Sequence, residues 1–553
     1  MATRLIERTE SSYEYPLLIK HLWHTPLRCS PQKEIVYRDI KRYDYVALYK
    51  RVGRLANLLE SLGIRAGDTV GVMDWDSHRY LESFMAVPMM GAVLHTVNVR
   101  LSSEQILYTI NHAEDKALLV HSDFLPLLEK IRPGMKTVKT LIVLSDTEAV
   151  PPTGLETAGE YESLLQKSPE GYDFADFDEN SMATTFYTTG TMGDPKGVYF
   201  SHRQIVLHTL CVAASAPFAT PGVTCNDVYM PLTPMSHVHA WGMPYLALML
   251  GLKQVYPGRY VPEELLGLIA GEGVTHSHCV PTVLSLLLES PAAASVDLSK
   301  LRLIIGGAPL SKTLCRAAMQ RGIGTFTGYG LSESCPTLTI AHLKPDMLQW
   351  SPEDQIDVRC RSGLPVPLVD VRIVDLEGND VDHDGLSVGE IVTRTPWLTQ
   401  GYVKEPELSE RLWSGRWLHT QDIGSIDKDG YLRVTDRLND AIKTGGEWIS
   451  SLQIENILLM HQAVSEAAVI GIPHQIWGER PCALVKLKEG YSDKVCEETF
   501  KAFFKIFVQK GAISKWAIPD KVLIVESIPK TSVGKQNKRK IRHIHTPPDA
   551  FAR

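Results

Sequence analysis

A segment rich in hydroxyls and glycines precedes a single lysine in TTFYTTGTMGDPKGVYFSH, residues 184–202. Three glycines and three threonines lie among the ten residues from Thr188 to Gly197, and Lys196 is the ninth of these ten. The sequence on each side of this segment reads as a β-strand. Such a segment has few side chains to bury, but it offers backbone N–H groups, hydroxyl donors and one ammonium. These groups favour a phosphate as the ligand. The segment does not match the G-x-x-x-x-G-K-[ST] loop, because Gly197 follows the lysine.

Two histidine pairs could carry a different chemistry. HVH (237–239) and HSHC (276–279) each space two histidines two residues apart, which places both on one face of a strand. Imidazole and thiolate groups are zinc ligands, so a zinc-binding protein is the alternative from another functional class. Neither a carboxylate nor a CxxC pair accompanies these residues, which weakens this alternative. The candidate ligands are His237, His239, His276, His278 and Cys279.

The composition is that of an ordinary globular protein. The chain has 553 residues, a formal net charge of -7 and 44% hydrophobic residues. The acidic balance argues against nucleic acid as a partner. Nine scattered cysteines form no CxxC pair, which indicates reduced thiols. With no apolar N-terminal leader and no apolar run long enough to span a bilayer, we expect a cytoplasmic protein without stable membrane insertion.

We call residues 188–197 the phosphate loop, after the ligand that we expect. The elements expected to position it alternate between strand and helix. We expect strands at 68–76, 92–99 and 116–122, separated by a helix at 77–91 and a second helix with a serine N-cap at 102–114. The pattern resumes with a helix at 204–214 and strands at 227–232 and 275–280. This alternation predicts an α/β fold whose parallel sheets carry helices on their faces.

The last third of the chain changes character. Short strands with turn signals over 360–435 predict a small antiparallel or barrel-like subdomain. Residues 437–553 read as a compact α+β domain of an ordinary size. We therefore expect an N-terminal domain at 1–436 and a C-terminal domain at 437–553.

Six motifs in one order resemble those of a known superfamily. They are YTTGTMGDPKG (187–197), MPLTPMSHVHAWG (230–242), IIGGAPL (304–310), TGYGLSES (327–334), the segment 419–455 and IPKTSVGK (528–535). Together they resemble the signature motifs of the adenylate-forming superfamily, which includes acyl-CoA synthetases, firefly luciferase and peptide-synthetase adenylation domains. The chain looks most similar to bacterial medium-chain fatty-acyl-CoA synthetases and methylmercaptopropionate-CoA ligases. The resemblance implies a mobile C-terminal lid that carries the catalytic lysine.

The resemblance implies a nucleotide site for ATP and AMP. The phosphate loop would wrap the β- and γ-phosphates, Ser332 would donate to the α-phosphate, and Glu333 would hold Mg²⁺. Several of the implied nucleotide residues also have a plainer interpretation. Tyr329 could be a core aromatic residue and Glu333 a solvated acid. Asp422 could be a turn residue, and Arg437 could be half of a surface ion pair. The implied nucleotide residues are Thr188, Thr189, Gly190, Thr191, Lys196, Gly306, Gly307, Ala308, Gly328, Tyr329, Gly330, Ser332, Asp422, Val434, Arg437 and Lys535.

The resemblance also implies an acyl pocket, a CoA segment and a hinge. The acyl pocket would be lined by His237, Trp241, Gly307, Gly328 and Pro336, and the CoA segment would comprise Lys443, Gly445, Gly446, Glu447 and Trp448. The hinge would be Asn439, where the family usually has lysine or aspartate. Met192 replaces a hydroxyl residue of the family loop. The implied catalytic residues are Lys535, Glu333, Lys196 and His237.

The implied function is that of an AMP-forming acid–thiol ligase. ATP, a carboxylic acid and CoA would give acyl-CoA, AMP and pyrophosphate through an acyl-adenylate. The expected acid is a medium-chain fatty acid, and a short, branched or thioether acid is the alternative. The cofactors are ATP, Mg²⁺ and coenzyme A; the partners are small molecules, and two copies of the chain could form a homodimer.

Overall fold

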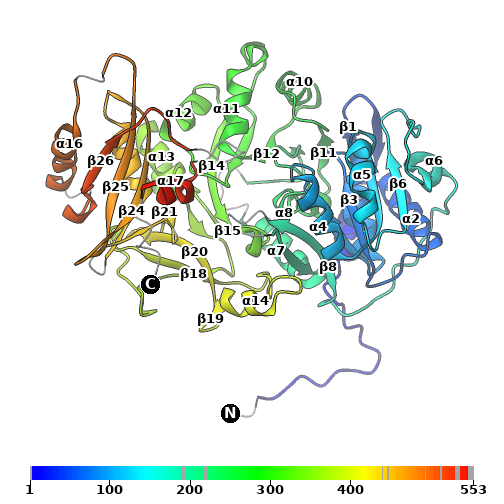
Figure 1. Ribbon diagram of the computed structural model, residues 1–553. Coiled ribbons are helices and arrows are strands. Elements are labelled where there is room, and N and C mark those ends of the chain that lie inside the picture. Colours follow the sequence, from blue (N-terminus) through cyan, green and yellow to red (C-terminus); the bar gives the residue numbers. More distant parts are fainter. Residues whose placement is uncertain are drawn as a thin grey trace. The chain divides into compact units, whose positions relative to one another are not determined.

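The computed structural model describes residues 3–188, 194–215, 222–438, 440–444, 447–491, 494–510, 513–529 and 536–545 (Figure 1). The chain forms two compact units. The first comprises Met1–Asp370 and Arg394–Arg416, and the second comprises Val371–Thr393 and Trp417–Arg553. Helices and sheets alternate through the first unit, so the predicted α/β class is confirmed. The expected boundary between an N-terminal domain at 1–436 and a C-terminal lid domain at 437–553 stays a prediction.

A seven-stranded sheet in the first unit positions the phosphate loop. Its strand order is β7-β6-β5-β3-β4-β8-β9, and every neighbouring pair is parallel except the antiparallel pair β8/β9. The predicted strands and helices of this region are present. The strands are β3 (Thr69–Met73), β4 (Val93–Thr96), β5 (Asp115–His121), β6 (Thr140–Leu144), β7 (Gly159–Glu160), β8 (Met182–Thr188) and β9 (Lys196–Ser201).

Serine caps begin two helices of this sheet, as the sequence predicts for the second of them. Ser77 accepts hydrogen bonds from the first turn of α3 (His78–Met89). Ser102 caps α4 (Ser103–Ala113) in a capping box that Gln105 completes. Such caps satisfy amides that have no partner inside the helix. The serines therefore define where each crossover helix starts.

A nine-stranded sheet forms the other half of the first unit. Its strand order is β16-β15-β14-β13-β12-β10-β11-β1-β2, with parallel pairing from β14 to β1. The strand expected at 227–232 is shorter, since β10 is Val228–Tyr229; Pro231 has no N–H to donate to a sheet. The other strands are β1 (Glu34–Tyr37), β2 (Lys41–Asp44), β11 (Lys253–Tyr256), β12 (His276–Cys279), β13 (Arg302–Ile305), β14 (Gly324–Gly330), β15 (Thr337–Ile340) and β16 (Leu364–Pro365).

Helices cover both faces of both sheets. One core contains residues of α2, α3 and α6 together with inward residues of both sheets, so these helices lie between the sheets. A second core joins the nine-stranded sheet to α10–α12, and a further core joins the seven-stranded sheet to α4 and α5. The remaining helices of the first unit are α1 (His24–Cys29), α2 (Tyr45–Ser61), α5 (Leu125–Ile131), α6 (Tyr161–Gln166), α7 (His202–Ser215), α8 (Val238–Trp241), α9 (Met243–Leu250), α10 (Pro262–Glu272), α11 (Pro281–Glu289), α12 (Lys312–Gln320), α13 (Pro352–Arg359) and α14 (Pro406–Leu412).

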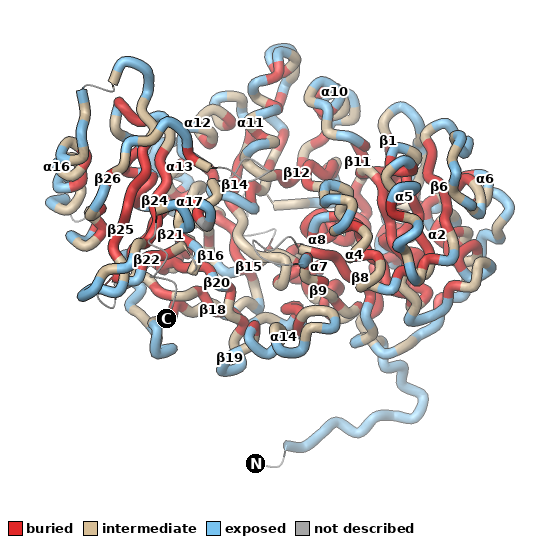
Figure 2. The backbone as a smooth tube through the Cα atoms, viewed as in Figure 1, coloured by how far each residue is buried: buried red, intermediate tan, exposed pale blue. Residues whose placement is uncertain are grey.

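The second unit contains two smaller sheets. Strands β18 (Gly389–Arg394), β20 (Trp417–Ile426) and β21 (Leu432–Arg437) pair antiparallel, and β17 (Asp370–Val374) lies beside β18. The other sheet has the order β23-β22-β25-β24 with β26 beside β25, and its central strands are buried (Figure 2). Its elements are β22 (Ile442–Thr444), β23 (Glu447–Ile449), β24 (Val464–His474), β25 (Gly478–Leu487), β26 (Lys521–Ile524), α15 (Ser451–Leu459), α16 (Glu497–Gln509) and α17 (Lys538–His545).

Within the described ranges, every helix is too short or too polar to cross a bilayer.

Candidate active site

The two ends of the phosphate loop face each other across the antiparallel pair β8/β9. Thr188, the last residue of β8, is directly opposite Lys196, the first residue of β9. The strands predicted on both sides of the loop are therefore present, and they hold the threonine and the lysine in register. The expected ligands Thr189, Gly190 and Thr191, and also Met192, lie outside the described residues.

One tyrosine connects the lysine of this loop to the expected metal-binding carboxylate. The Lys196 ammonium lies 5.0 Å from the ring centroid of Tyr402, and the Tyr402 hydroxyl donates to Glu333 Oε1 over 2.7 Å. Burial, together with the charge of Glu333, raises the pKa of Tyr402, so this hydroxyl remains a donor at neutral pH. Lys196, Tyr402 and Glu333 therefore form one connected group of a cation, an aromatic ring and a carboxylate.

Backbone pairing brings Tyr402 to this position from a distant part of the chain. Val198 of β9 forms an isolated bridge with Tyr402, and the Val403 amide donates to the Gly197 carbonyl over 2.8 Å. The Thr399 amide donates to the Glu333 carbonyl over 2.9 Å. Sequence analysis did not identify Tyr402, because a tyrosine after a glycine in a loop has no chemical pattern of its own.

The expected adenine-side residues gather at one edge of the nine-stranded sheet. Gly306, Gly307 and Ala308 follow the end of β13, while Gly328, Tyr329 and Gly330 end the neighbouring strand β14. Since β13 and β14 are parallel, their carboxyl ends meet at the same edge, where ligands of such sheets usually bind. Ser332 and Glu333 follow in a 3₁₀ turn, Ser332–Ser334.

Residue 330 must be a glycine because the backbone of Pro336 packs against it. A Cβ at this position would lie 1.7 Å from the Pro336 carbonyl oxygen, which no side chain tolerates. The expected acyl-pocket residue Pro336 therefore packs directly against the end of β14.

Of the expected acyl-pocket residues not yet placed, Trp241 lies in a left-handed turn that includes α8, and His237 directly precedes this turn. From Val238 to Gly242 every φ angle is positive, between 46° and 73°. Non-glycine residues rarely adopt this conformation, and such strain is found at functional sites. His237, just before the turn, is exposed, whereas Trp241 is buried with 9% of its surface accessible. The turn therefore directs Trp241 inward and leaves His237 outside the core.

The histidine pairs do not form a metal centre. Over the described parts of the chain, no group of three or more His, Cys, Asp or Glu side chains is arranged to hold a metal ion. His278 instead accepts or donates a hydrogen bond with the Tyr229 hydroxyl over 2.9 Å. His239 is surrounded by the rings of Phe84, Phe186 and Tyr245. The zinc alternative thus gains no support from the geometry.

The expected ribose residues belong to the second unit. Asp422 and Arg437 are opposite each other on β20 and β21, and Arg437 Nε lies 2.8 Å from Asp422 Oδ1. Asp422 is buried and Arg437 is mostly exposed, so the carboxylate orients a cation that reaches into solvent. Val434 lies on the same strand as Arg437. The role of these residues toward ribose stays a prediction.

The expected CoA segment contributes two antiparallel strands, β22 and β23, to the second unit. Lys443 on β22 is opposite Trp448 on β23, and the Lys443 ammonium lies 4.8 Å from the centroid of the Trp448 ring system. The Lys443 amide donates to Glu479 Oε2 over 2.9 Å. Gly445, Gly446 and the side chain of Glu447 lie outside the described residues.

The expected hinge residue Asn439 and the expected catalytic residue Lys535 also lie outside the described residues, and the contacts of neighbouring residues are as follows. After Asn439, Asp440 pairs with Arg542 of α17 over 3.1 Å. Around Lys535, the Asn537 amide donates to the Pro529 carbonyl over 2.8 Å, and Lys538 pairs with buried Glu455 over 2.8 Å. The segments that flank the expected hinge and lysine therefore both attach to α17.

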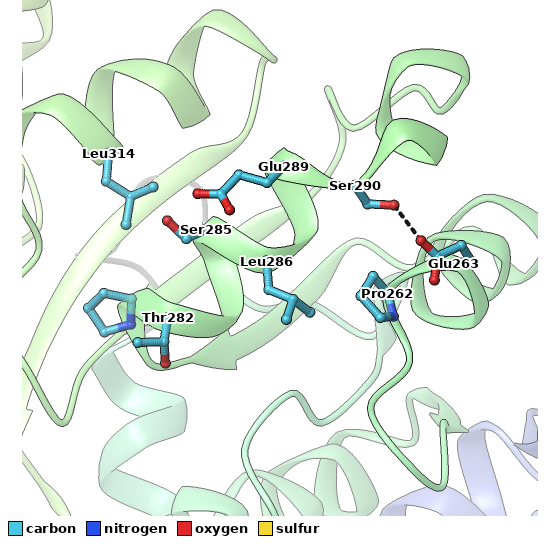
Figure 3. Close-up of a pocket in the computed structure, with 9 residues that line it drawn as sticks. Pro262, Glu263, Thr282, Ser285, Leu286, Glu289, Ser290 and Leu314 are labelled. Atoms are coloured by element: carbon cyan, nitrogen blue, oxygen red, sulfur yellow. Dashed lines mark hydrogen bonds between the residues drawn. The ribbon is translucent and has the colours of Figure 1, made fainter. Parts of the chain in front are cut away.

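A surface pocket of about 520 Å³ lies between α10, α11 and α12 (Figure 3). Glu263 and Glu289 line it, and Ser290 Oγ donates to Glu263 Oε1 over 3.0 Å (Figure 3). None of the residues expected at the nucleotide or acyl sites lines this pocket. The pocket is therefore separate from the candidate active site.

Comparison with known proteins agrees with the order of the motifs. The model of the AMP-binding enzyme family matches residues 24–403, and the model of its C-terminal domain matches residues 453–535. The chain is 39% identical to a long-chain-fatty-acid–CoA ligase of Thermus thermophilus, with 92% of each chain covered. It is 36% identical to a 3-methylmercaptopropionyl-CoA ligase of Ruegeria lacuscaerulensis, over 95% of this chain and 97% of that protein.

A solved structure supports the same conclusion. The fatty acyl CoA synthetase of Mycobacterium tuberculosis is 25% identical, with a TM-score of 0.74 over 96% of this chain and 99% of that chain. Family match, relatives and fold agree over almost the whole sequence. The chain therefore belongs to the AMP-binding enzyme family, and it is an acid–thiol ligase of the acyl-CoA synthetase type that uses ATP and CoA.

Proposed function

We propose that this acyl-CoA synthetase activates medium-chain fatty acids. The two relatives bracket this size, since one is named for long-chain fatty acids and the other for methylmercaptopropionate. The buried indole of Trp241 at the acyl motif supports a pocket of limited depth. A short, branched or thioether acid is the second candidate, and the methylmercaptopropionate relative favours it.

The connected group Lys196–Tyr402–Glu333 is the observation on which the proposed mechanism depends most. Attack of a carboxylate on the α-phosphate of ATP brings like charges together, so the site must supply cations and donors where charge develops. Lys196 and Thr188 are paired at the two ends of the phosphate loop, and both would bind the leaving pyrophosphate. Lys535, on the lid, would neutralise the attacking carboxylate and the α-phosphate.

Glu333 is the proposed holder of Mg²⁺. Mg²⁺ takes oxygen ligands and usually binds through one or two carboxylates together with phosphates. Glu333 is half-buried and presents a carboxylate whose Oε1 accepts from Tyr402, an arrangement that fits this ion. When bound, the ion would neutralise charge on the triphosphate, while the tyrosine orients the carboxylate.

The second unit supplies the residues of the proposed lid. Lys535 serves adenylation and the hairpin of Lys443 and Trp448 serves transfer to CoA, so the lid would rotate about Asn439 between the two steps. Ser332 would contact the α-phosphate, and Asp422 and Arg437 would contact the ribose. We further propose a cytoplasmic enzyme and, as its assembly, a homodimer.

Pyrophosphate release across a panel of carboxylic acids, with and without CoA, tests the proposal. We expect turnover to be greatest with medium-chain acids, and acyl-CoA to form when CoA is present. Higher kcat/KM for methylmercaptopropionate than for any fatty acid would favour the second candidate. Absence of acyl-CoA with every acid would contradict the proposed function.

A further inference from the structure

A buried histidine stands directly behind Trp241. His276 and His278 lie on the same face of β12, as alternate residues of a strand do. The His278 ring is fully buried, and its centroid lies 5.0 Å from that of the Trp241 indole at an interplanar angle of 35°. The Tyr229 hydroxyl is 2.9 Å from His278 Nε2. The hydrogen bond from a neighbouring strand therefore fixes the imidazole against the indole.

Gly306 borders the other edge of the indole. A Cβ at Gly306 would lie 2.9 Å from Trp241 Cη2 and 3.0 Å from the Gly328 carbonyl oxygen. The indole thus occupies space that the absence of a side chain at Gly306 provides. Trp241 is held between the turn after β13 on one side and His278 on the other.

The imidazole of His278 is uncharged in this position. Burial lowers the pKa of His278 to about 3, so the ring is uncharged at neutral pH. A neutral ring packed against an indole can border an alkyl chain without the large penalty of a buried charge. Tyr229 is fully buried as well, so a second buried side chain supports the imidazole.

We propose that His278, held by Tyr229, forms the end of the acyl pocket behind Trp241 and thereby limits the substrate to acids of medium length or shorter. This inference rests on the proposed function. It makes His278 a specificity-determining residue and not a catalytic one. It also gives a role to one of the histidines that the zinc alternative used.

The chain-length profile of variants tests the inference. We would measure kcat/KM for straight-chain acids from butyrate to palmitate with the full-length wild type, His278→Ala, Trp241→Ala and the double variant. Each additional methylene that becomes buried raises kcat/KM about fourfold. Space for two further methylenes in His278→Ala therefore shifts the preference toward longer acids by more than about tenfold.

His276→Ala is the matched control. This residue is on the same strand and face and is also buried, and its charged neighbours are Arg302 and Asp227. We expect its chain-length profile to equal that of the wild type. Tyr229→Phe keeps the ring but releases the imidazole, so it should shift the profile in the same direction by a smaller factor.

The outcomes separate the inference from the function that underlies it. If His278→Ala folds and keeps the wild-type KM for ATP but shows the wild-type chain-length profile, the inference is wrong. If His278→Ala does not fold, His278→Val replaces it, because a β-branched side chain suits a strand, and the same criterion applies. If the wild type forms no acyl-CoA from any acid, the proposed function fails first.

Discussion

Replacing Tyr402 with phenylalanine tests the connection between the phosphate loop and Glu333, the carboxylate proposed to bind Mg²⁺. The substitution keeps the ring that lies 5.0 Å from the Lys196 ammonium and removes the hydroxyl that is 2.7 Å from Glu333. A hydrogen bond to a charged group contributes about 1.5–3 kcal/mol when it is well buried. Glu333 is only half-buried, so we expect a contribution around the lower limit of this range, about 1–2 kcal/mol, or roughly a five- to thirtyfold slower adenylation.

The assay is acid-dependent pyrophosphate release as a function of Mg²⁺ and ATP concentration. Tyr402→Phe should raise the Mg²⁺ concentration needed for half-maximal rate more than it raises the KM for ATP. The reason is that the hydroxyl contacts Glu333, whereas the ring contacts Lys196. Tyr402→Leu removes the ring as well, and it should impair the ATP dependence further. Tyr199→Phe, on the same strand as Lys196, is the control, since its hydroxyl lies beside Gly401. Wild-type kinetics in Tyr402→Phe would refute the reasoning.

Three further predictions concern other parts of the molecule. Lys196→Ala should slow adenylation by about a hundredfold or more with unchanged thermal unfolding, and unaltered ATP kinetics would rule out its assigned role. Lys535→Ala should nearly abolish acyl-adenylate formation yet still convert supplied acyl-adenylate and CoA to thioester, whereas Trp448→Ala should do the reverse; equal loss in both half-reactions would contradict a two-conformation lid. The free energy of unfolding should fall steeply below pH 6.5. Burial holds the pKa of five histidines at about 3 to 4 in the folded state, whereas the same histidines take up protons near pH 6.5 in the unfolded chain. Each ring should therefore lower the free energy of unfolding by up to about 1.4 kcal/mol per pH unit. Thermal midpoints that do not change between pH 7 and pH 5 would be inconsistent with these buried neutral rings, which are His202, His208, His239, His276 and His278.

The sequence by itself determined the features that depend on near neighbours in the chain. The alternation of strands and helices, the serine cap at Ser102 and the two strands beside the phosphate loop follow from local periodicity and capping. The order of the six motifs was enough to indicate the family. Where a local rule was overlooked, the prediction failed: the strand expected at 227–232 ends early because Pro231 has no amide hydrogen to donate to the sheet.

The tertiary structure decided which distant side chains meet. Tyr402 reaches Glu333 across 69 positions because its segment pairs with β9 and with the turn after β14. His278 meets Trp241 because β12 and the left-handed turn lie against the same glycine-lined edge. Periodicity describes which face a residue occupies, but the partner on that face depends on how separate elements pack. For that reason the sequence suggested metal ligands in the HSHC motif, whereas packing gives His278 a tyrosine and a tryptophan as neighbours.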